Sequence, residues 1–267
     1  MAKQKQILYF IKIIPLFLFL SIFSAKEPFQ EFKIKKNYFP EYIYNSNIKI
    51  DGKLDDLAWE NALIINDFVQ VKPIYNSIPS KKTDVKVLYD DDALYIGVNL
   101  FDNLENIVVR KSQYDDWEGG FENKSDYFVV EIDSRHDHQT SYGFAINSYG
   151  SKADYMLHND NLSNDDWNAI WDADVDITDN GWTIEYKIPF NILKYHDNDD
   201  MGINFIRYIQ RNNELIYWVL LSEELDGVIS HYGHINTLKL TNKDNLIVKP
   251  YILYGNTKFN NTFYDYD

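Results

Sequence analysis

Residues 171–189 read WDADVDITDNGWTIEYKIP, and this stretch decides the fold class. Asn180-Gly181 is one of the strongest short signals for a tight hairpin turn, because both residue types tolerate positive φ angles. After the turn, positions 182, 184, 186 and 188 are apolar and alternate with polar residues, as in a half-buried strand. Pro189 ends the strand because it has no N–H to donate. The stretch therefore predicts two antiparallel strands, Trp171–Ile177 and Gly181–Ile188.

Short strand patterns with turn signals between them recur across residues 46–241. They lie at Asn47–Lys53, Val85–Tyr89, Leu94–Phe101, Tyr127–Asp133, Ser141–Asn147, Ala153–Leu157, Gly202–Gln210, Leu215–Leu221 and His234–Leu240. A helical pattern appears only as one or two turns near residues 55–61, with Asp55 or Asp56 as N-cap. The sequence therefore predicts an all-β fold, a mostly antiparallel β-sandwich with one short helix.

The composition excludes several classes of function. The net charge is −15 over 267 residues, and such a surface repels phosphate backbones, so we expect no nucleic-acid partner. The chain has no cysteine, which excludes disulfides, thiolate metal sites and cysteine nucleophiles.

The N-terminus has the pattern of a signal peptide, which we place at residues 1–25. Lys3 and Lys5 precede an apolar stretch, and Ile13–Phe23 is an uncharged core too short to span a bilayer comfortably. An uncleaved membrane anchor is the alternative. Both interpretations place the rest of the chain outside the cytoplasm.

Two further segments flank the predicted sandwich. Residues 26–45 are mixed and polar, and we expect a connector that adds an edge strand. Residues 242–267 begin a new strand at Leu246 but contain no element to pair with it, so we expect them to start a longer C-terminal domain.

Four phrases in order carry a resemblance to a known family. They are Ile48–Trp59, Val85–Val98, Ser125–Asp133 and Gly181–Phe190. Together they make residues 46–241 resemble the family 9 carbohydrate-binding modules. The resemblance implies a jelly-roll type β-sandwich that binds a glycan without catalysis.

Residues 242–267 resemble the junction in large bacterial proteins where this module precedes an outer-membrane β-barrel. That resemblance implies a start of such a barrel here, with the outer membrane as partner. It also implies the periplasm or the cell surface of a Gram-negative bacterium as location.

The candidate sugar-binding residues come partly from composition and partly from the resemblance. Trp117 and Trp167 sit in acidic, polar stretches, which favours exposed indole rings that can stack on a sugar. The resemblance implies that Trp117-Glu118 forms one wall of the sugar slot and that Asn147 matches a family position. The family's second wall is a tryptophan, and here Tyr232 or His231 stands nearest to that place. The family's arginine on the strand 141–147 is absent.

Metal and catalytic chemistry have weaker signals. Asp172, Asp174 and Asp176 alternate, so a strand would place all three on one face, where calcium could bridge them. His136 and His138 are further candidate ligands, although a turn is the commoner meaning of their segment. No cofactor is required, and we expect the acids of Asp115–Asp133 to be solvated loop residues and not a catalytic pair.

Three functions follow. The first is a non-catalytic glycan-binding module of a secreted or outer-membrane protein involved in polysaccharide breakdown or uptake. The second is a structural or gating module that has lost sugar binding, which the missing tryptophan and arginine favour. The third is an accessory part of a glycoside hydrolase whose catalytic residues lie in another domain.

Overall fold

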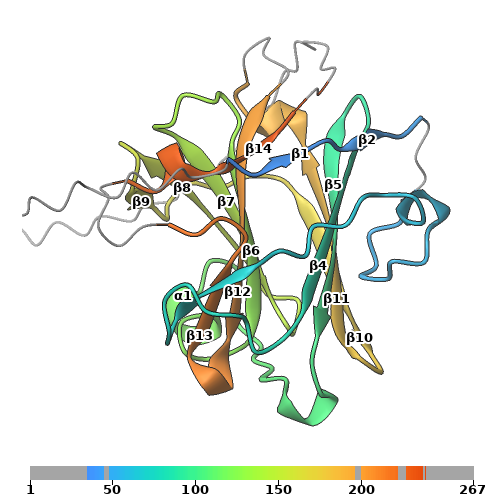
Figure 1. Ribbon diagram of the computed structural model, residues 1–267, viewed down its shortest axis with the longest axis vertical. Helices are drawn as coiled ribbons and strands as arrows, with labels where there is room; N and C mark the ends of the chain where they lie inside the picture. The colour runs from blue at the N-terminus through green and yellow to red at the C-terminus, as the bar shows by residue number, and fades with distance from the viewer. Residues whose placement is uncertain (1–34, 45–47, 196–199, 222–226, 237, 239–267) are drawn as a thin grey trace, which may run out of the picture. The chain divides into compact units, whose positions relative to one another are not determined.

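The computed structural model describes residues 35–44, 48–195, 200–221, 227–236 and 238. Within these residues, two β-sheets lie face to face, as predicted (Figure 1). The predicted signal peptide at 1–25 and the predicted start of a C-terminal domain at 242–267 lie outside the described residues.

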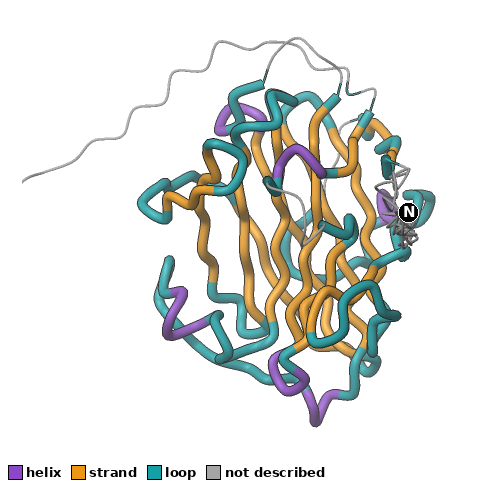
Figure 2. Tube along the Cα trace, turned by 60° about the vertical axis from the view of Figure 1, so that its left-hand side comes forward, coloured by secondary structure: helices purple, strands orange, loops and turns teal. Residues whose placement is uncertain are grey.

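Among the described residues, the larger sheet has nine strands. Figure 2 shows how strands dominate the described chain, with loops and short helices at their ends. The main order of the larger sheet is β1 (Asn37–Tyr38), β14 (Gly233–Ile235), β12 (Met201–Ile209), β6 (Tyr127–Asp133), β7 (Ser141–Asn147), β8 (Lys152–His158) and β9 (Leu162–Asn164). The second half of β12 also pairs with β13 (Glu214–Tyr217), which continues to β3 (Val69–Lys72).

The smaller sheet has five strands in the order β10 (Asp172–Thr178), β11 (Gly181–Pro189), β5 (Ala93–Phe101), β4 (Thr83–Tyr89) and β2 (Glu41–Tyr42). Neighbouring strands in both sheets are antiparallel, except that β1 pairs with β14 and β2 with β4 in parallel. The predicted edge strand in the connector is thus confirmed, and this segment adds a strand to each sheet.

Helices are short. The one α-helix among the described residues is α1 (Trp117–Gly120), and the 3-10 helices are η1 (Leu57–Trp59), η2 (Leu104–Asn106), η3 (Phe190–Ile192), η4 (Gln210–Asn212) and η5 (Ile229–His231). η1 confirms the helical turn predicted near residues 55–61. Across the part of the chain that the structure describes, helices are too short to cross a membrane.

The hairpin that opened the argument forms as predicted. β10 and β11 pair in register from Asp172↔Lys187 to Thr178↔Gly181, and Gly181 has a φ of +143°. The apolar side chains of β11 point between the sheets, where Trp182, Ile184, Tyr186 and Ile188 are fully buried. Burial of this apolar surface is the main stabilising contribution of the sandwich.

The strand predicted at Asn47–Lys53 does not form. Residues 48–53 run as a loop over the outer face of the smaller sheet, where Ile48 and Ile50 pack near the buried Trp59. The backbone N–H groups of Asp51 and Gly52 donate to Oε2 of Glu185, at 3.0 and 3.1 Å. A buried carboxylate therefore satisfies backbone groups that a neighbouring strand would otherwise satisfy.

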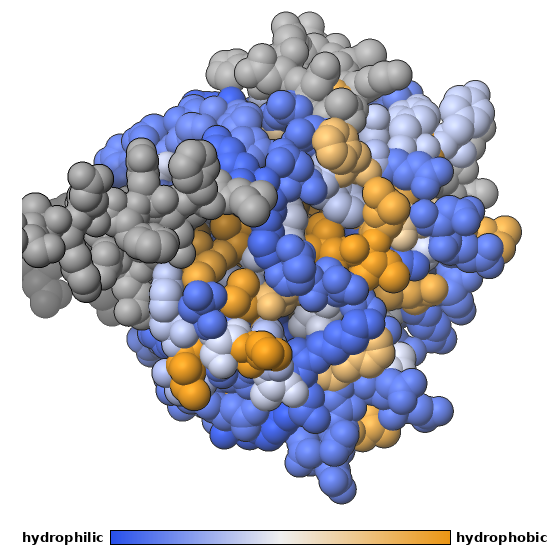
Figure 3. Space-filling model, viewed as in Figure 1, coloured by the Kyte–Doolittle hydropathy of each residue, from blue (hydrophilic) through white to orange (hydrophobic). Residues whose placement is uncertain are grey.

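Much of the molecular surface is hydrophilic, as the net charge leads one to expect. On the face shown in Figure 3, hydrophilic side chains predominate and hydrophobic ones form separate patches between them. The layer between the two sheets, by contrast, is built mainly from apolar side chains, while buried polar residues such as Glu131, Asp154 and Arg207 are held by hydrogen bonds.

Candidate functional site

A groove of about 460 Å³ lies on the outer face of the larger sheet, on the side away from the sandwich core. Its floor is formed by outward side chains of β6, β8 and β12, among them Val129, Tyr155 and Ile206. Val129 of β6 pairs with Ala145 of β7, which pairs with Ala153 of β8. Gly143 occupies the neighbouring outward position of β7 and has no side chain.

A buried carboxylate lies at the floor of this groove. Glu131 is 4% exposed, and its Oε1 accepts a hydrogen bond from the Tyr155 hydroxyl at 2.5 Å. Its Oε2 accepts from the Tyr232 hydroxyl at 2.6 Å. Burial raises the pKa of Glu131, and the two tyrosine hydrogen bonds offset this only in part.

Aromatic side chains form the walls of the groove. Trp117 is half-buried, and its ring centroid lies 4.8 Å from that of Phe121 and 5.5 Å from that of Tyr155. Tyr127 and Tyr217 also line the groove. Such rings provide the flat apolar faces on which the C–H groups of a sugar pack.

The position of Trp117 is set by the first turn of α1. The side chain of Asp116 caps this turn by accepting from the N–H of Gly119 at 2.9 Å. The indole Nε1 of Trp117 is buried and has no hydrogen-bond partner among the described residues. A buried donor without a partner is uncommon. Because this N–H has almost no exposed surface, the part of Trp117 that lines the groove is its ring.

Polar residues form the remaining rim. Glu122, Asn161, Ser163 and Asp165 line the groove together with Glu131, and the Ser163 hydroxyl donates to Asp165. None of the lining residues is Lys, Arg or His. The groove thus combines aromatic walls with hydrogen-bond acceptors.

The structure brings together only part of the predicted site. Trp117 lines the groove, and Tyr232 contacts its floor through Glu131. Glu118 is exposed on α1 and lies outside the lining residues.

Asn147, expected to face the sugar, is fully buried and used by the protein itself. Its Nδ2 donates to the carbonyls of Arg110 and Gly120, at 2.8 and 3.0 Å. Its Oδ1 accepts from the N–H groups of Tyr149 and Ser151. We therefore correct its role to that of fixing the loops beside α1.

Trp167 lies on the opposite face of the larger sheet from Trp117. Its ring packs at 4.7 Å from Tyr142 and 5.9 Å from Phe144, both of which belong to the core between the sheets. The neighbouring Asp165 and Asp166 are exposed while the indole turns inward. The prediction that the acidic neighbours of Trp167 indicate an exposed, sugar-binding indole ring is therefore wrong.

The three aspartates of β10 do not form a metal site. Asp172 and Asp174 are exposed, and Asp172 pairs with Lys152 at 3.6 Å. Within the described ranges, no group of three acidic or histidine side chains is close enough to hold a metal ion. We therefore place no calcium at Asp172, Asp174 and Asp176, nor any metal at His136 and His138.

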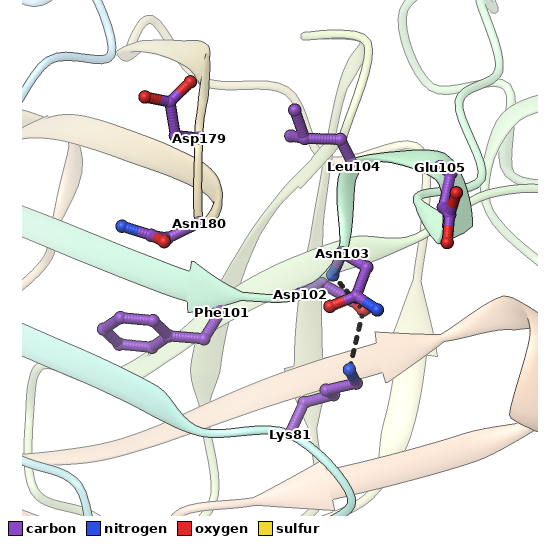
Figure 4. Close-up of a pocket in the computed structure, with 8 residues that line it drawn as sticks. All are labelled: Lys81, Phe101, Asp102, Asn103, Leu104, Glu105, Asp179 and Asn180. Carbon is purple, nitrogen blue, oxygen red and sulfur yellow. Dashed lines mark hydrogen bonds and ion pairs between the residues drawn. The ribbon is translucent and has the colours of Figure 1, made fainter.

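A second hollow, of about 540 Å³, lies beside the ends of β5 and β11 (Figure 4). Asp102 at its base is held by Arg211 at 2.7 Å and by Lys81 at 3.2 Å. Burial opposes the ionisation of Asp102, but these hydrogen bonds outweigh burial and lower its pKa. The charge of Asp102 is therefore paired with Arg211 and Lys81 within the protein, and we assign no ligand to this second hollow.

Sequence reasoning missed the centre of the groove. Glu131 is among the acids expected to be solvated loop residues, although it directly follows the apolar run Phe128–Val130 of strand β6. A lone carboxylate on a buried strand is costly unless it has partners, and that was the available signal. Tyr155 and Gly143 carried no such signal, because their role depends on cross-strand register.

Comparison with known proteins identifies the class. A sequence model of the carbohydrate family 9 binding domain-like family matches residues 50–219. This span is most of the chain, so the protein belongs to that family, as the four phrases implied. No curated protein matches the chain.

Solved structures share the fold. A family 9 carbohydrate-binding module from Caldicellulosiruptor kristjanssonii, in complex with cellotriose, is 16% identical with a TM-score of 0.53, covering 80% of this chain and 100% of that one. A module of the same family and organism, in complex with glucose, is 20% identical with a TM-score of 0.51, covering 79% and 99%. A proposed carbohydrate-binding protein from Bacteroides uniformis is 10% identical with a TM-score of 0.59, covering 76% and 99%.

Proposed function

We propose that this domain binds a glycan in the groove on the outer face of the larger sheet. The observation that carries the proposal is the buried Glu131 at the floor of an aromatic-walled hollow. The carboxylate is held by two tyrosine hydroxyls, and each of its oxygens retains capacity for a further hydrogen bond from a sugar hydroxyl.

The walls supply the other half of sugar recognition. Trp117 offers a ring face on which the C–H groups of a sugar can pack. Its relatives in the family support the assignment, since solved modules of this fold hold cellotriose and glucose.

The test is a glycan array probed with the chain and with a Trp117→Ala variant. We expect the chain to bind a subset of neutral glycans and the variant to lose that binding while it keeps the far-UV circular dichroism of the parent. Binding that is unchanged in the variant would place the sugar elsewhere.

One observation favours the second candidate, a structural or gating module without sugar binding. Asn147, which matches a family position, has no free hydrogen-bonding capacity here, and the strand Ser141–Asn147 carries no arginine. An array on which no glycan binds would support this candidate.

The wider setting is also part of the proposal. The apolar N-terminal stretch and the strand-like C-terminal tail support export and attachment to an outer-membrane β-barrel, with a role in polysaccharide breakdown or uptake. Hydrolysis of a bound glycan, if the full protein carries it out, belongs to a different domain.

A further inference from the structure

The charge of the groove points to a narrower class of ligand, and this inference rests on the proposed function. Glu122, Glu131 and Asp165 line the groove, and no cationic side chain does. The tyrosines that line it stay neutral, because burial raises the pKa values of Tyr127, Tyr155 and Tyr217 above their usual range. The net charge of the lining is therefore negative.

One further acid, Asp115, interacts electrostatically with Asp165 of the groove lining. Burial raises the pKa of Asp115, and the charges of Asp154 and Asp165 raise it further. The Asp154 carboxylate faces the core, where it accepts from the indole N–H of Trp171 at 2.7 Å, so Asp115 is the acid that adds to the charge of Asp165 at the rim. The nearby cation Lys152 is engaged with Asp172 and does not line the groove.

Such a lining discriminates between sugars by charge. Carboxylates accept hydrogen bonds and attract cations, whereas the carboxylate of a uronic acid in the same groove would be repelled. An ammonium group would also gain from the face of Trp117, because an aromatic ring attracts cations.

We propose that the groove selects glycans by charge, preferring sugars with a free amine to the same sugars with an N-acetyl or hydroxyl group, and rejecting uronic acids. The ligand class is thus an oligosaccharide containing 2-amino-2-deoxyhexose units. Asp165 and Glu122 at the rim pair with the amine, and Glu131 at the floor accepts from a hydroxyl.

The experiment is isothermal titration of the full chain with four oligosaccharides of equal length. They are oligomers of glucosamine, N-acetylglucosamine, glucose in β-1,4 linkage and galacturonic acid, at a slightly acidic pH where the amine is charged. We expect the glucosamine oligomer to bind about threefold to tenfold more tightly than the N-acetylated and neutral ones, as two exposed ion pairs allow. High salt should remove most of this preference, because it screens exposed charges.

Matched variants locate the effect. Glu122→Gln combined with Asp165→Asn should abolish the preference for the amine. Glu60→Gln serves as control, because Glu60 is exposed next to η1 on the outer face of the other sheet and removes one charge without altering the groove.

Three outcomes would overturn the inference. Equal affinity for the amine-bearing and N-acetylated oligomers would do so, as would binding of the galacturonate oligomer. In either case, loss of the remaining binding on Trp117→Ala would still support a sugar site in this groove. If none of the four oligomers bound, the inference would fail, while the glycan array would still decide whether the groove binds another sugar.

Discussion

Tyr155 occupies the space that a side chain at Gly143 would need. A Cβ placed on Gly143 would lie 2.2 Å from Cζ of Tyr155, far inside van der Waals contact. The ring crosses β7 at this point, and its hydroxyl reaches Glu131 on the next strand. The absence of one side chain thus lets β8 supply a hydrogen bond to a carboxylate two strands away.

The first prediction concerns this relationship. Gly143→Ala should displace the Tyr155 ring, leave Glu131 short of a donor and lower the free energy of unfolding by about 1–3 kcal/mol. Urea denaturation measures the change. Tyr155→Phe keeps the ring and should cost about 1 kcal/mol, and a Gly143→Ala variant as stable as the parent would contradict the described contact.

The second prediction separates the two tryptophans that the sequence treated alike. Trp117→Ala should abolish glycan binding, because its ring lines the groove on the outer face of the larger sheet. Trp167→Ala should leave binding intact but lower stability by a few kcal/mol, because its ring packs on the core residues Tyr142 and Phe144. Glycan affinity and urea denaturation should be measured on both variants. Loss of binding in Trp167→Ala, with binding kept in Trp117→Ala, would refute this assignment.

The third prediction is a pH dependence at a histidine trio. The ring of His136 lies 4.8 Å from that of His138 and 4.5 Å from that of His234. Burial, together with the charges of His136 and Lys35, lowers the pKa of His234 from 6.5 to about 4. Folding therefore favours the neutral imidazole, and its contribution to stability is present above pH 6.5 and lost as the pH falls toward 4.

The free energy of unfolding, followed by urea denaturation between these pH values, should therefore fall more steeply with acid in the parent than in His234→Gln. His158→Gln on β8 controls for removal of an imidazole outside the trio. Identical slopes for the parent and His234→Gln would show that His234 does not titrate in this way.

The fourth prediction concerns the segment that precedes the family-matched residues. Tyr38, at the end of β1, is 6% exposed, and its hydroxyl donates to the carbonyl of Leu63 at 2.7 Å. Tyr38→Ala should lower the free energy of unfolding by about 3–5 kcal/mol, as for other large aromatic truncations in a core. Tyr44 is 79% exposed and serves as the control. The free energy of unfolding of Tyr44→Ala, measured by thermal or urea denaturation, should almost equal that of the parent. A small effect at Tyr38 would mean that this segment is dispensable for folding.

Much of the fold could be predicted from the sequence because strand periodicity is a local signal. The hairpin around Asn180-Gly181 and the strands β4 to β8 follow from alternation and turn residues alone. The failure at Asn47–Lys53 came from a long-range interaction, since Glu185 satisfies that backbone from another strand. Residues 46–241 were predicted as one domain, and the family match at 50–219 falls within them.

The site was predictable only in part. Trp117 was found because a motif and an acidic context both marked it, but the same context misplaced Trp167, whose ring faces the core. The face of the sheet on which a residue lies follows from the alternation of side chains along its own strand. Its neighbours on that face depend on the register between strands that are distant in sequence. Glu131, Tyr155 and Tyr232 come from three segments that meet only in the folded sheet.

The central claim is that a glycan binds on the outer face of the larger sheet, and a methyl NMR titration of the chain tests it most directly. With any oligosaccharide that binds on the array, the methyl signals of Val129, Leu157 and Ile206, which line the groove, should shift. Those of Val98 and Ile184, buried between the sheets, should stay in place. Shifts confined to other residues, with the groove methyls unmoved, would contradict the account.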